Sequence, residues 1–320
     1  MAKHASREGL TVVITGASSG FGKGVAQKLS EEGANVVLAA RRTALIEELA
    51  RQCGPNAVAV TTDISKEGDM QRLMDTALSR FGQVDVWFNN AGLGILGSFT
   101  DTPLKDLNRL VDINMIGTMY GTHLALRQFK KQGHGTLINM SSFVSKVPLP
   151  FGAAYTATKF GITGMTGGLY EEMKLDGHRD IHICTVHPWV TDTPWVEHLA
   201  NYSGHEIVLG PVDAPEKVIG IIIGLIDRPK ADVDVGFKSK AAVASFEGMP
   251  QVVEYLNGRS LLGMLRSAPE AANSAGSLHQ PKDEGTEVSG EMRKRLKKET
   301  YRRQVSRKNL KRTGRKQHAK

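Results

Sequence analysis

The sequence predicts an α/β fold in which a doubly wound parallel sheet carries helices on both faces. Residues 10–14 form a nearly continuous apolar and β-branched run, which is typical of a strand buried on both faces. Val25, Ala26 and Leu29 follow this run at helical spacing. The alternation of strand and helix then repeats with ~25 to 30 residues per unit, as expected for parallel strands joined by crossover helices.

The later elements follow the first unit in order. Each predicted strand is a short apolar run, and each predicted helix repeats its apolar residues at helical spacing. We expect strands at residues 35–39, 57–61, 84–88, 135–140, 180–186 and 232–235, helices at 43–52, 66–80, 107–129, 154–175 and 213–226, and up to two short helices within 243–265. This order predicts a Rossmann-type fold in a single domain, residues 8–265.

The composition is ordinary for a globular chain without membrane spans. The 320 residues are 23% charged and 40% hydrophobic. The longest apolar run, residues 218–226, contains Gly220 and Gly224 and has about half of the ~20 residues that a span requires. Residues 1–9 are polar and charged, so we expect no signal peptide and a cytoplasmic location. The two cysteines, Cys53 and Cys184, give no disulfide framework, and we interpret both as packing residues.

The excess positive charge lies at one end of the chain. Residues 291–320 contain 14 Lys and Arg against two Glu, a net charge of +12, whereas residues 1–290 carry 27 basic and 31 acidic side chains, a net charge of −4. Before this basic tail, residues 266–290 are rich in Ser, Gly, Pro, Ala and acids, which predicts a disordered linker. The tail, also predicted to be disordered, could contact nucleic acid or acidic lipid nonspecifically, or it could have no specific partner.

A glycine-rich turn follows the first strand. Thr15 to Gly22 reads Thr-Gly-Ala-Ser-Ser-Gly-Phe-Gly and opens the first helix. Glycines allow a sharp turn and a close approach to a pyrophosphate, whose charge the N–H groups at the helix N-terminus can receive. A tight turn without a ligand is the alternative. The predicted cofactor-binding residues here are Gly16, Ser18, Ser19, Gly20, Phe21 and Gly22.

Two arginines follow the second strand. In dinucleotide sites an acid at this position binds the ribose hydroxyls of NAD, whereas an arginine can pair with the 2′-phosphate of NADP. Arg41 and Arg42 therefore favour NADP(H), although they could also be a solvated start to the next helix. After the third strand, Asp63 and Ile64 are expected beside the adenine.

Tyr155 and Lys159 are four residues apart in a predicted helix, so their side chains share one face. An ammonium near a phenol favours the phenolate, and we therefore expect Lys159 to lower the pKa of Tyr155 toward neutral pH. Such a tyrosine could give and take a proton. The pair alone is weak evidence, because the spacing arises by chance on many helices.

Four motifs in the same order together resemble the short-chain dehydrogenase/reductase family. They are Thr15-Gly-x-x-x-Gly-x-Gly22, Asn89-Asn-Ala-Gly92, Ser142 placed thirteen residues before Tyr155, and Tyr155-x-x-x-Lys159. Asn114 also stands where this family has its fourth catalytic residue. The resemblance covers roughly residues 8–240 and implies a dinucleotide site that includes Asn90, Ala91 and Gly92.

The resemblance implies a role for each catalytic residue. Ser142, at the carboxyl end of a strand, would bond a substrate carbonyl and stabilise the charge that develops on its oxygen. Tyr155 would transfer the proton, and Lys159 would tune Tyr155 and bond the nicotinamide ribose. Asn114 would hold a water that links Lys159 to solvent.

The segment after strand 180–186 is expected to contact both the cofactor and the substrate. Pro188, Val190, Thr191 and Thr193 are the predicted cofactor residues here. The family usually has glycine after the proline, whereas this chain has Trp189, which leaves the local turn open and could place an indole against the nicotinamide or the substrate. Residues 189–210 are expected to be an irregular substrate lid. With Ser142 and Tyr155, Trp189 and Trp195 are the predicted substrate residues, and their apolar character favours an apolar substrate.

The helix that carries Tyr155 also contains Gly161, Gly164, Gly167 and Gly168. Each glycine costs ~0.5 to 1 kcal/mol relative to alanine in a helix interior, so close approach by another element should offset that cost. In similar enzymes this helix packs across a subunit interface, and a homodimer or homotetramer is our hypothesis. Close packing within one subunit is the alternative.

The sequence thus predicts an NADP(H)-dependent oxidoreductase that interconverts a carbonyl and an alcohol on an apolar small molecule, without a metal. The cofactor would carry the hydride and the protein would align it. The alternative is a catalytically idle dinucleotide-binding scaffold whose basic tail binds nucleic acid. A scaffold has no physical need for Asn114, Ser142, Tyr155 and Lys159 together.

Overall fold

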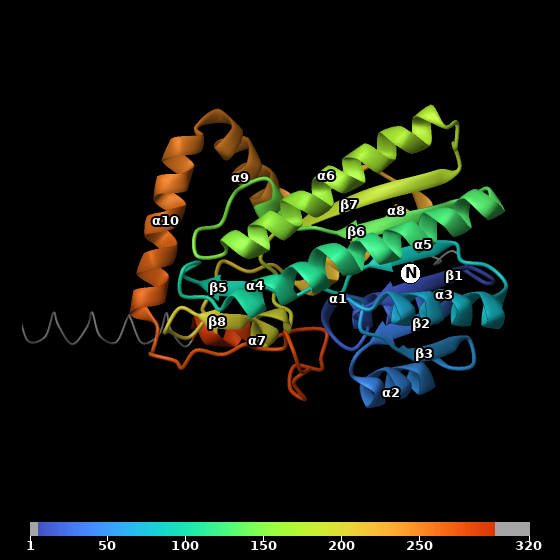
Figure 1. Ribbon diagram of the computed structural model, residues 1–320, viewed down its shortest axis with the longest axis horizontal. Coiled ribbons are helices and arrows are strands. Elements are labelled where there is room, and N and C mark those ends of the chain that lie inside the picture. Colours follow the sequence, from blue (N-terminus) through green and yellow to red (C-terminus); the bar gives the residue numbers. More distant parts are fainter. Residues whose placement is uncertain (1–5, 298–320) are drawn as a thin grey trace, which may run out of the picture.

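The structure, a computed structural model, describes residues 6–297 and confirms the predicted α/β class (Figure 1). The strands are β1 (Thr11–Thr15), β2 (Asn35–Ala40), β3 (Ala57–Thr61), β4 (Val86–Asn89), β5 (Ile95–Gly97), β6 (Gly135–Met140), β7 (Ile181–Pro188), β8 (Ala200–Tyr202) and β9 (Asp232–Val235). The helices are α1 (Gly20–Glu31), α2 (Thr43–Cys53), α3 (Glu67–Phe81), α4 (Leu104–Val111), α5 (Gly117–Gln132), α6 (Ala153–Leu175), α7 (Trp195–His198), α8 (Pro215–Asp227), α9 (Gly236–Gly248) and α10 (Pro250–Ser267).

Seven of the strands form one parallel sheet in the order β3-β2-β1-β4-β6-β7-β9. From β1 the chain first builds outward through β2 and β3, and then returns to the other side of β1 for β4 and its successors. This reversal creates a topological switch point between β1 and β4. In open α/β sheets, ligands bind at such a point, beyond the carboxyl ends of the strands.

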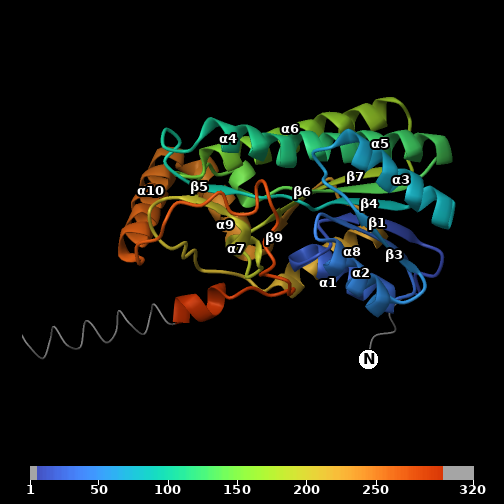
Figure 2. The ribbon, with the colours of Figure 1, turned by 60° about the horizontal axis from the view of Figure 1, so that its bottom comes forward.

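Helices cover both faces of the sheet (Figure 2). The side chains of α1, α2 and α8 pack on one face, where Val25, Ile46 and Val218 are buried. The side chains of α3 and α5 pack on the opposite face, where Leu73 and Phe129 are buried. Because both faces are covered, all five residues of β1 are buried, as its continuous apolar sequence predicts.

The predicted helix 107–129 is divided in the structure. It consists of α4, a π-helical turn at Asp112–Ile116, and α5. The wider turn contains Asn114, whose side chain is buried and bonded to the backbone of Leu93. Apolar spacing does not identify this turn, because the residues on each side of it still repeat at helical spacing. Predicted helix 213–226 begins at Pro215, whose fixed φ suits the first helical position.

The prediction of a disordered linker at residues 266–290 is wrong. The end of α10 occupies residues 266 and 267, and residues 268–290, here called the C-terminal strap, run back along the carboxyl edge of the sheet beside α7 and α1 (Figures 1 and 2). Leu278 of the strap is completely buried in the core, and Ser277 is almost so. Backbone hydrogen bonds to His198, Gly20 and Asp192 fix the strap along its length. The polar composition hid this segment because many of its contacts are with arginine and backbone groups, and only a few apolar side chains such as Leu278 anchor it.

Past the strap, residues 292–297 form a short helix, and Met292 at its start is buried. The rest of the predicted basic tail, residues 298–320, lies outside the described residues. Among helices of the described part, none combines the length and apolar character needed to cross a bilayer.

Candidate active site

A cavity of about 280 Å³ lies beyond the carboxyl ends of the central strands. Its walls come from the turn after β1, the ends of β2, β4 and β6, the start of α6, the segment after β7, and the strap. Most of the residues predicted from the sequence line it: Gly16, Ser18, Ser19, Gly20, Phe21, Arg41, Arg42, Asp63, Ile64, Asn90, Ala91, Gly92, Ser142, Tyr155, Lys159, Pro188, Trp189, Val190, Thr191, Thr193 and Trp195. Of the predicted set, Gly22 and Asn114 lie just behind the wall.

The glycine-rich turn is shaped by close backbone packing. Gly16 has a φ of +69°, and a Cβ there would lie 2.9 Å from Cα of Ala91. A Cβ on Gly22 would overlap the carbonyl oxygen of Gly16. The side chain of Asn90 closes the turn by donating to the carbonyl of Thr15 at 2.9 Å. This cradle brings α1 with its N-terminal N–H groups to the cavity wall, the arrangement in which a helix binds a phosphate.

Ser142, Tyr155 and Lys159 converge at the opposite end of the cavity. The Ser142 hydroxyl lies close enough to the Tyr155 phenol to lower its pKa. Nζ of Lys159 donates to the carbonyl of Met140 at 2.8 Å and lies 5.7 Å from the centroid of the Tyr155 ring. The Lys159 side chain is only 4% exposed, so its ammonium is held in one place. A hydroxyl donor and an ionisable phenol thus meet in one cavity, as a carbonyl undergoing reduction would require.

Asn114 lies behind the cavity wall and fixes the segments next to Tyr155 and Lys159. Its Nδ2 donates to the carbonyl of Leu93 at 2.8 Å and to Oγ1 of Thr158 at 3.0 Å, and its Oδ1 accepts from the Leu93 amide at 2.9 Å. These contacts tie the Asn-Ala-Gly segment to α6. Asn114 is therefore a positioning residue in this geometry.

The comparison with known families agrees with this geometry. The family model described as short chain dehydrogenase matches residues 10–202. The chain belongs to the short-chain dehydrogenase/reductase family. It is therefore an oxidoreductase of this family with a dinucleotide-type site.

Several relatives of this short-chain dehydrogenase are named oxidoreductases. An uncharacterised oxidoreductase of Bacillus subtilis is 32% identical over 251 residues, covering 77% of this chain and 70% of the relative. An NADP-dependent (R)-specific alcohol dehydrogenase of Lentilactobacillus kefiri is 34% identical over 195 residues, covering 60% and 77%. The crystal structure of a 3-ketoacyl-(acyl-carrier-protein) reductase from Brucella melitensis, complexed with NADH, superposes with a TM-score of 0.64 at 30% identity, covering 72% of this chain and 98% of that one.

The protonation of the site differs from the expectation. Burial raises the pKa of the Tyr155 phenol, and the nearby Ser142 hydroxyl offsets this only in part. Burial also lowers the pKa of Lys159 to about 8. The expected lowering of the Tyr155 pKa by Lys159 is wrong for this geometry, because loss of hydration disfavours the phenolate and the opposing influence is the Ser142 hydroxyl rather than the ammonium. Tyr155 therefore carries its proton at neutral pH.

Arg41 and Arg42 reach the adenosine end of the cavity, where both contact the strap. Nη2 and Nη1 of Arg41 donate to the carbonyls of Ser277 at 2.5 Å and Leu278 at 3.2 Å. Arg42 donates to the hydroxyls of Ser18 at 3.1 Å and Ser19 at 2.8 Å. Arg42 does stand at the start of α2, but neither arginine is merely solvated, because both donate to strap carbonyls and burial lowers the pKa of both.

The predicted lid is partly regular. Residues 189–210 contain α7, and they contain β8, which pairs with β5. The Trp195 ring lies 5.1 Å from that of Tyr155, and its Nε1 donates to the carbonyl of Gly92 at 3.2 Å. Trp189 stacks at 4.4 Å on Phe143. Its φ is not positive, so a tryptophan fits where the family usually has glycine. Both indoles give the substrate end of the cavity an apolar wall.

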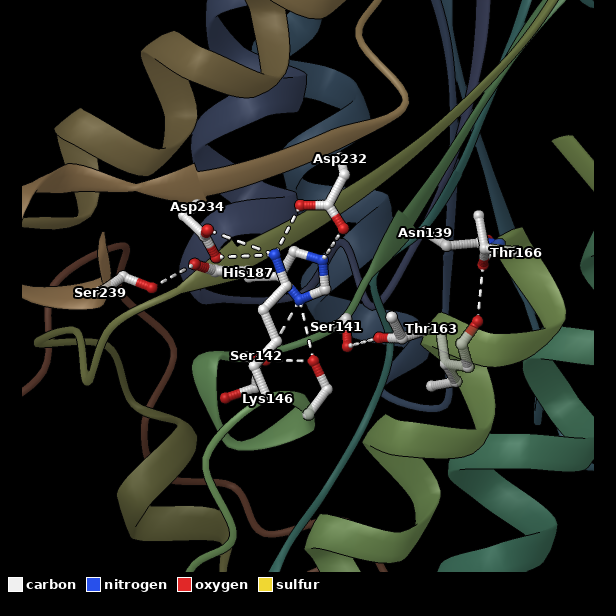
Figure 3. Close-up of polar contacts among 12 residues, drawn as sticks. Asn139, Ser141, Ser142, Lys146, Thr163, Thr166, His187, Asp232, Asp234 and Ser239 are labelled. Carbon is white, nitrogen blue, oxygen red and sulfur yellow. Dashed lines mark hydrogen bonds and ion pairs between the residues drawn. The ribbon is translucent and has the colours of Figure 1, made fainter. Parts of the chain in front are cut away.

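A polar cluster centred on the buried side chain of His187 fixes the loop that carries Ser142 (Figure 3). His187, at the end of β7, has no solvent exposure. Its Nε2 contacts Oδ2 of Asp232 at 3.1 Å, and its Nδ1 lies 2.9 Å from the hydroxyl of Ser145 and 3.3 Å from the carbonyl of Ser142. Because a carboxylate only accepts, Nε2 carries a proton. Burial would raise the pKa of Asp232, but hydrogen bonds from His187 and Lys146 lower it to about 2.

Sequence reasoning missed side chains from distant parts of the chain that line the cavity or hold its lining residues in place. Arg109 of α4 pairs with Asp63 at 2.7 Å and donates to the carbonyl of Leu278 at 3.1 Å. Pro281 and Lys282 of the strap line the cavity wall. None of these residues belongs to a motif, so no local signal could have identified them.

Proposed function

We propose that this short-chain dehydrogenase is an NADP(H)-dependent oxidoreductase that interconverts a carbonyl and an alcohol on an apolar small molecule. The observation that carries the proposal is the meeting of the Ser142 hydroxyl, the protonated Tyr155 phenol and the buried Lys159 in the cavity that the glycine-rich turn also lines. The glycine cradle at the other end supports the cofactor part of the proposal, since added side chains would clash there with the backbone.

The residues divide the work as follows. The bound nicotinamide cofactor supplies or accepts the hydride. In the reducing direction Tyr155 gives its proton to the carbonyl oxygen, while Ser142 donates a hydrogen bond to the same oxygen. Lys159 holds the ribose and stabilises the phenolate that Tyr155 becomes after giving up its proton. Asn114 holds the segment after Gly92 against α6. It would also hold the water that links Lys159 to solvent.

The character of the wall supports an apolar substrate. The end of the cavity near Tyr155 is lined by apolar and aromatic side chains: Phe143, Val144, Leu149, Trp189, Trp195 and Leu209. Such a wall binds substrate through burial of apolar area, and Ser142 and Tyr155 would orient the carbonyl. The intact catalytic set weighs against an idle scaffold.

The preference for NADP(H) is supported by charge at the end of β2. Arg41 and Arg42 replace the acid that would receive the ribose hydroxyls of NAD. The Lentilactobacillus kefiri relative is named as NADP-dependent, whereas the Brucella melitensis reductase was crystallised with NADH. The proposed preference for NADP(H) therefore rests on the two arginines and not on the relatives.

A homodimer or homotetramer is supported by the exposed surface of α6 and its neighbours. A side-chain carbon added at Gly164, Gly167 or Gly168 would meet no neighbouring atom within 4 Å in the described part of the chain, so intrachain packing does not explain these glycines. Nearby, Met119 and Phe160 are 43% and 41% exposed. Small residues beside exposed apolar side chains allow close approach of a second copy.

The Tyr155→Phe variant tests the catalytic role. The substitution keeps the ring and its contact with Trp195 but removes the proton, so turnover should fall by about 10² to 10⁴-fold. Binding of NADPH, followed by tryptophan fluorescence, should stay within about twofold because the phenol oxygen contributes little to binding. Tyr170→Phe on the same helix, outside the cavity, is the matched control and should keep wild-type activity. An active Tyr155→Phe variant would refute the role.

The Arg41→Ala variant tests cofactor choice. Loss of a charge-assisted pair with the 2′-phosphate should weaken NADPH binding by about 10 to 100-fold, while NADH binding changes by less than about threefold. Titration with each cofactor measures the ratio. Arg51→Ala is the matched control, because Arg51 is exposed on α2 and pairs with Glu48. Equal loss of both cofactors would show that Arg41 does not bind the 2′-phosphate.

Sedimentation velocity at micromolar concentration tests the assembly. The wild-type chain should sediment as a dimer or tetramer, and Gly164→Arg should sediment as a smaller species because its side chain would block close approach of the helices. Gly68→Arg places the same change on α3, where there is also open space, and should leave the assembly intact. A wild-type chain that is only monomeric would remove the proposal.

A further inference from the structure

The C-terminal strap crosses the cavity from the side of α7 to the N-terminus of α1. The Ser277 amide donates to the carbonyl of His198 at 2.9 Å, and the Gly290 amide donates to the carbonyl of Asp192 at 2.9 Å. Between these points the strap lies against Arg41, Arg42 and Gly20. One continuous segment therefore covers the adenosine half of the site.

The strap engages the same donors that the proposed function assigns to the cofactor phosphates. Arg41 donates to the carbonyls of Ser277 and Leu278. Nη1 of Arg42 donates to the carbonyl of Glu284 at 2.9 Å, with the carbonyl oxygens of Lys282 and Gly285 within 3.4 Å. These acceptors are neutral carbonyl oxygens, which hold a guanidinium more weakly than a phosphate does.

The N-terminus of α1 is covered by the same segment. The Gly20 amide donates to the carbonyl of Glu287 at 2.9 Å. An N–H group at the start of a helix is a natural donor to a phosphate. The strap thus also occupies a donor for the pyrophosphate, which NAD(H) and NADP(H) share, so a difference between the two cofactors must come from the arginines.

The strap is held by contacts that lie outside the cofactor cradle. Leu278 is buried without exposure in the core. The hydroxyl of Ser277 bonds Nδ1 of His198 at 3.0 Å, and Nε2 of His279 contacts Oδ1 of Asp106 at 2.7 Å. The covered state is therefore specifically stabilised, and a substitution can loosen it without touching the arginines.

We propose that the strap is a specificity determinant that competes with the 2′-phosphate of NADP(H) for Arg41 and Arg42. This inference rests on the proposed function. NADP(H) must displace the strap carbonyls before its phosphate can reach the guanidiniums. NAD(H) carries a hydroxyl at the same position, needs no guanidinium there, and can donate to a strap carbonyl. The covered state therefore lowers apparent affinity for NADP(H) more than for NAD(H), because apparent affinity falls with the fraction of molecules that can bind.

Hydrogen exchange on the full chain tests the competition directly, because displacement of the strap raises its deuterium uptake whereas closure of the strap lowers it. Saturating NADPH should increase deuterium uptake in residues 276–290, because the Ser277 and Gly290 amides lose their partners when the strap leaves. Saturating NADH should leave that uptake close to the value without cofactor. Decreased uptake with NADPH would show that the strap closes over this cofactor, and unchanged uptake would show that the strap stays in place; either result overturns the inference.

The Leu278→Ala variant tests the same point by affinity. It removes the apolar anchor of the strap, so NADPH binding should tighten by about tenfold or more, while NADH binding should change by less than about threefold. Leu261→Ala of α10 is the matched control, since Leu261 is also buried but lies outside the cavity, and should leave both affinities unchanged. Equal effects on both cofactors, or weaker binding of both, would show that the strap is a fixed wall of the site, and this result would contradict the inference.

The two proposals fail in distinguishable ways. If NADPH binds neither the wild-type chain nor Leu278→Ala, the proposed function fails, and this inference fails with it. If NADPH binds with the expected dependence on Arg41 but uptake in the strap does not rise, the proposed function stands and only the competition is refuted.

Discussion

The contact between Thr15 and Asn90 is the constraint on which the site depends. At the switch point, Oγ1 of Thr15 accepts from the amides of Asn90 at 2.9 Å and Ala91 at 3.1 Å, while the Asn90 side chain returns a hydrogen bond to the Thr15 carbonyl. These bonds join the two halves of a sheet whose strand order reverses there. They hold the glycine-rich turn against the Asn-Ala-Gly segment, and Asn114 ties that segment to α6. The nucleotide cradle and the catalytic helix are thereby fixed in one geometry.

Loss of hydration then determines the protonation of Tyr155 and Lys159 in that geometry. The same burial that fixes Tyr155 and Lys159 raises the pKa of the phenol and lowers the pKa of the ammonium to about 8. Each group is thus biased toward its neutral form, and Tyr155 begins as an acid. Behind them, the contact between His187 and Asp232 lies below the Ser142 loop, so the donor hydroxyl has a rigid support. The protonation of both groups follows from their loss of hydration where the chain packs around them.

The sequence predicted the features that depend on local pattern. Buried parallel strands read as continuous apolar runs, and the glycine turn and the Tyr155–Lys159 spacing are short enough to recognise directly. The features that the sequence did not predict depend on contacts between residues far apart in the chain or on the degree of burial. Arg41 and Leu278 are 237 positions apart, and the strap is polar, so no periodic pattern connects them. The pKa of Tyr155 was misjudged because a sequence reveals the neighbouring charge but not the degree of burial. The π-turn at Asn114 adds one residue, which apolar spacing does not resolve.

The most direct test of the account follows the hydride itself. The full-length protein would be given an apolar ketone and NADPH doubly deuterated at the reactive nicotinamide carbon, and the alcohol product would be analysed by mass spectrometry. We expect one deuterium on the carbon that bore the carbonyl, with the hydroxyl proton drawn from solvent through Tyr155. Oxidation of NADPH without deuterium in the alcohol, or bound cofactor with no reduction across a panel of apolar aldehydes and ketones, would contradict it.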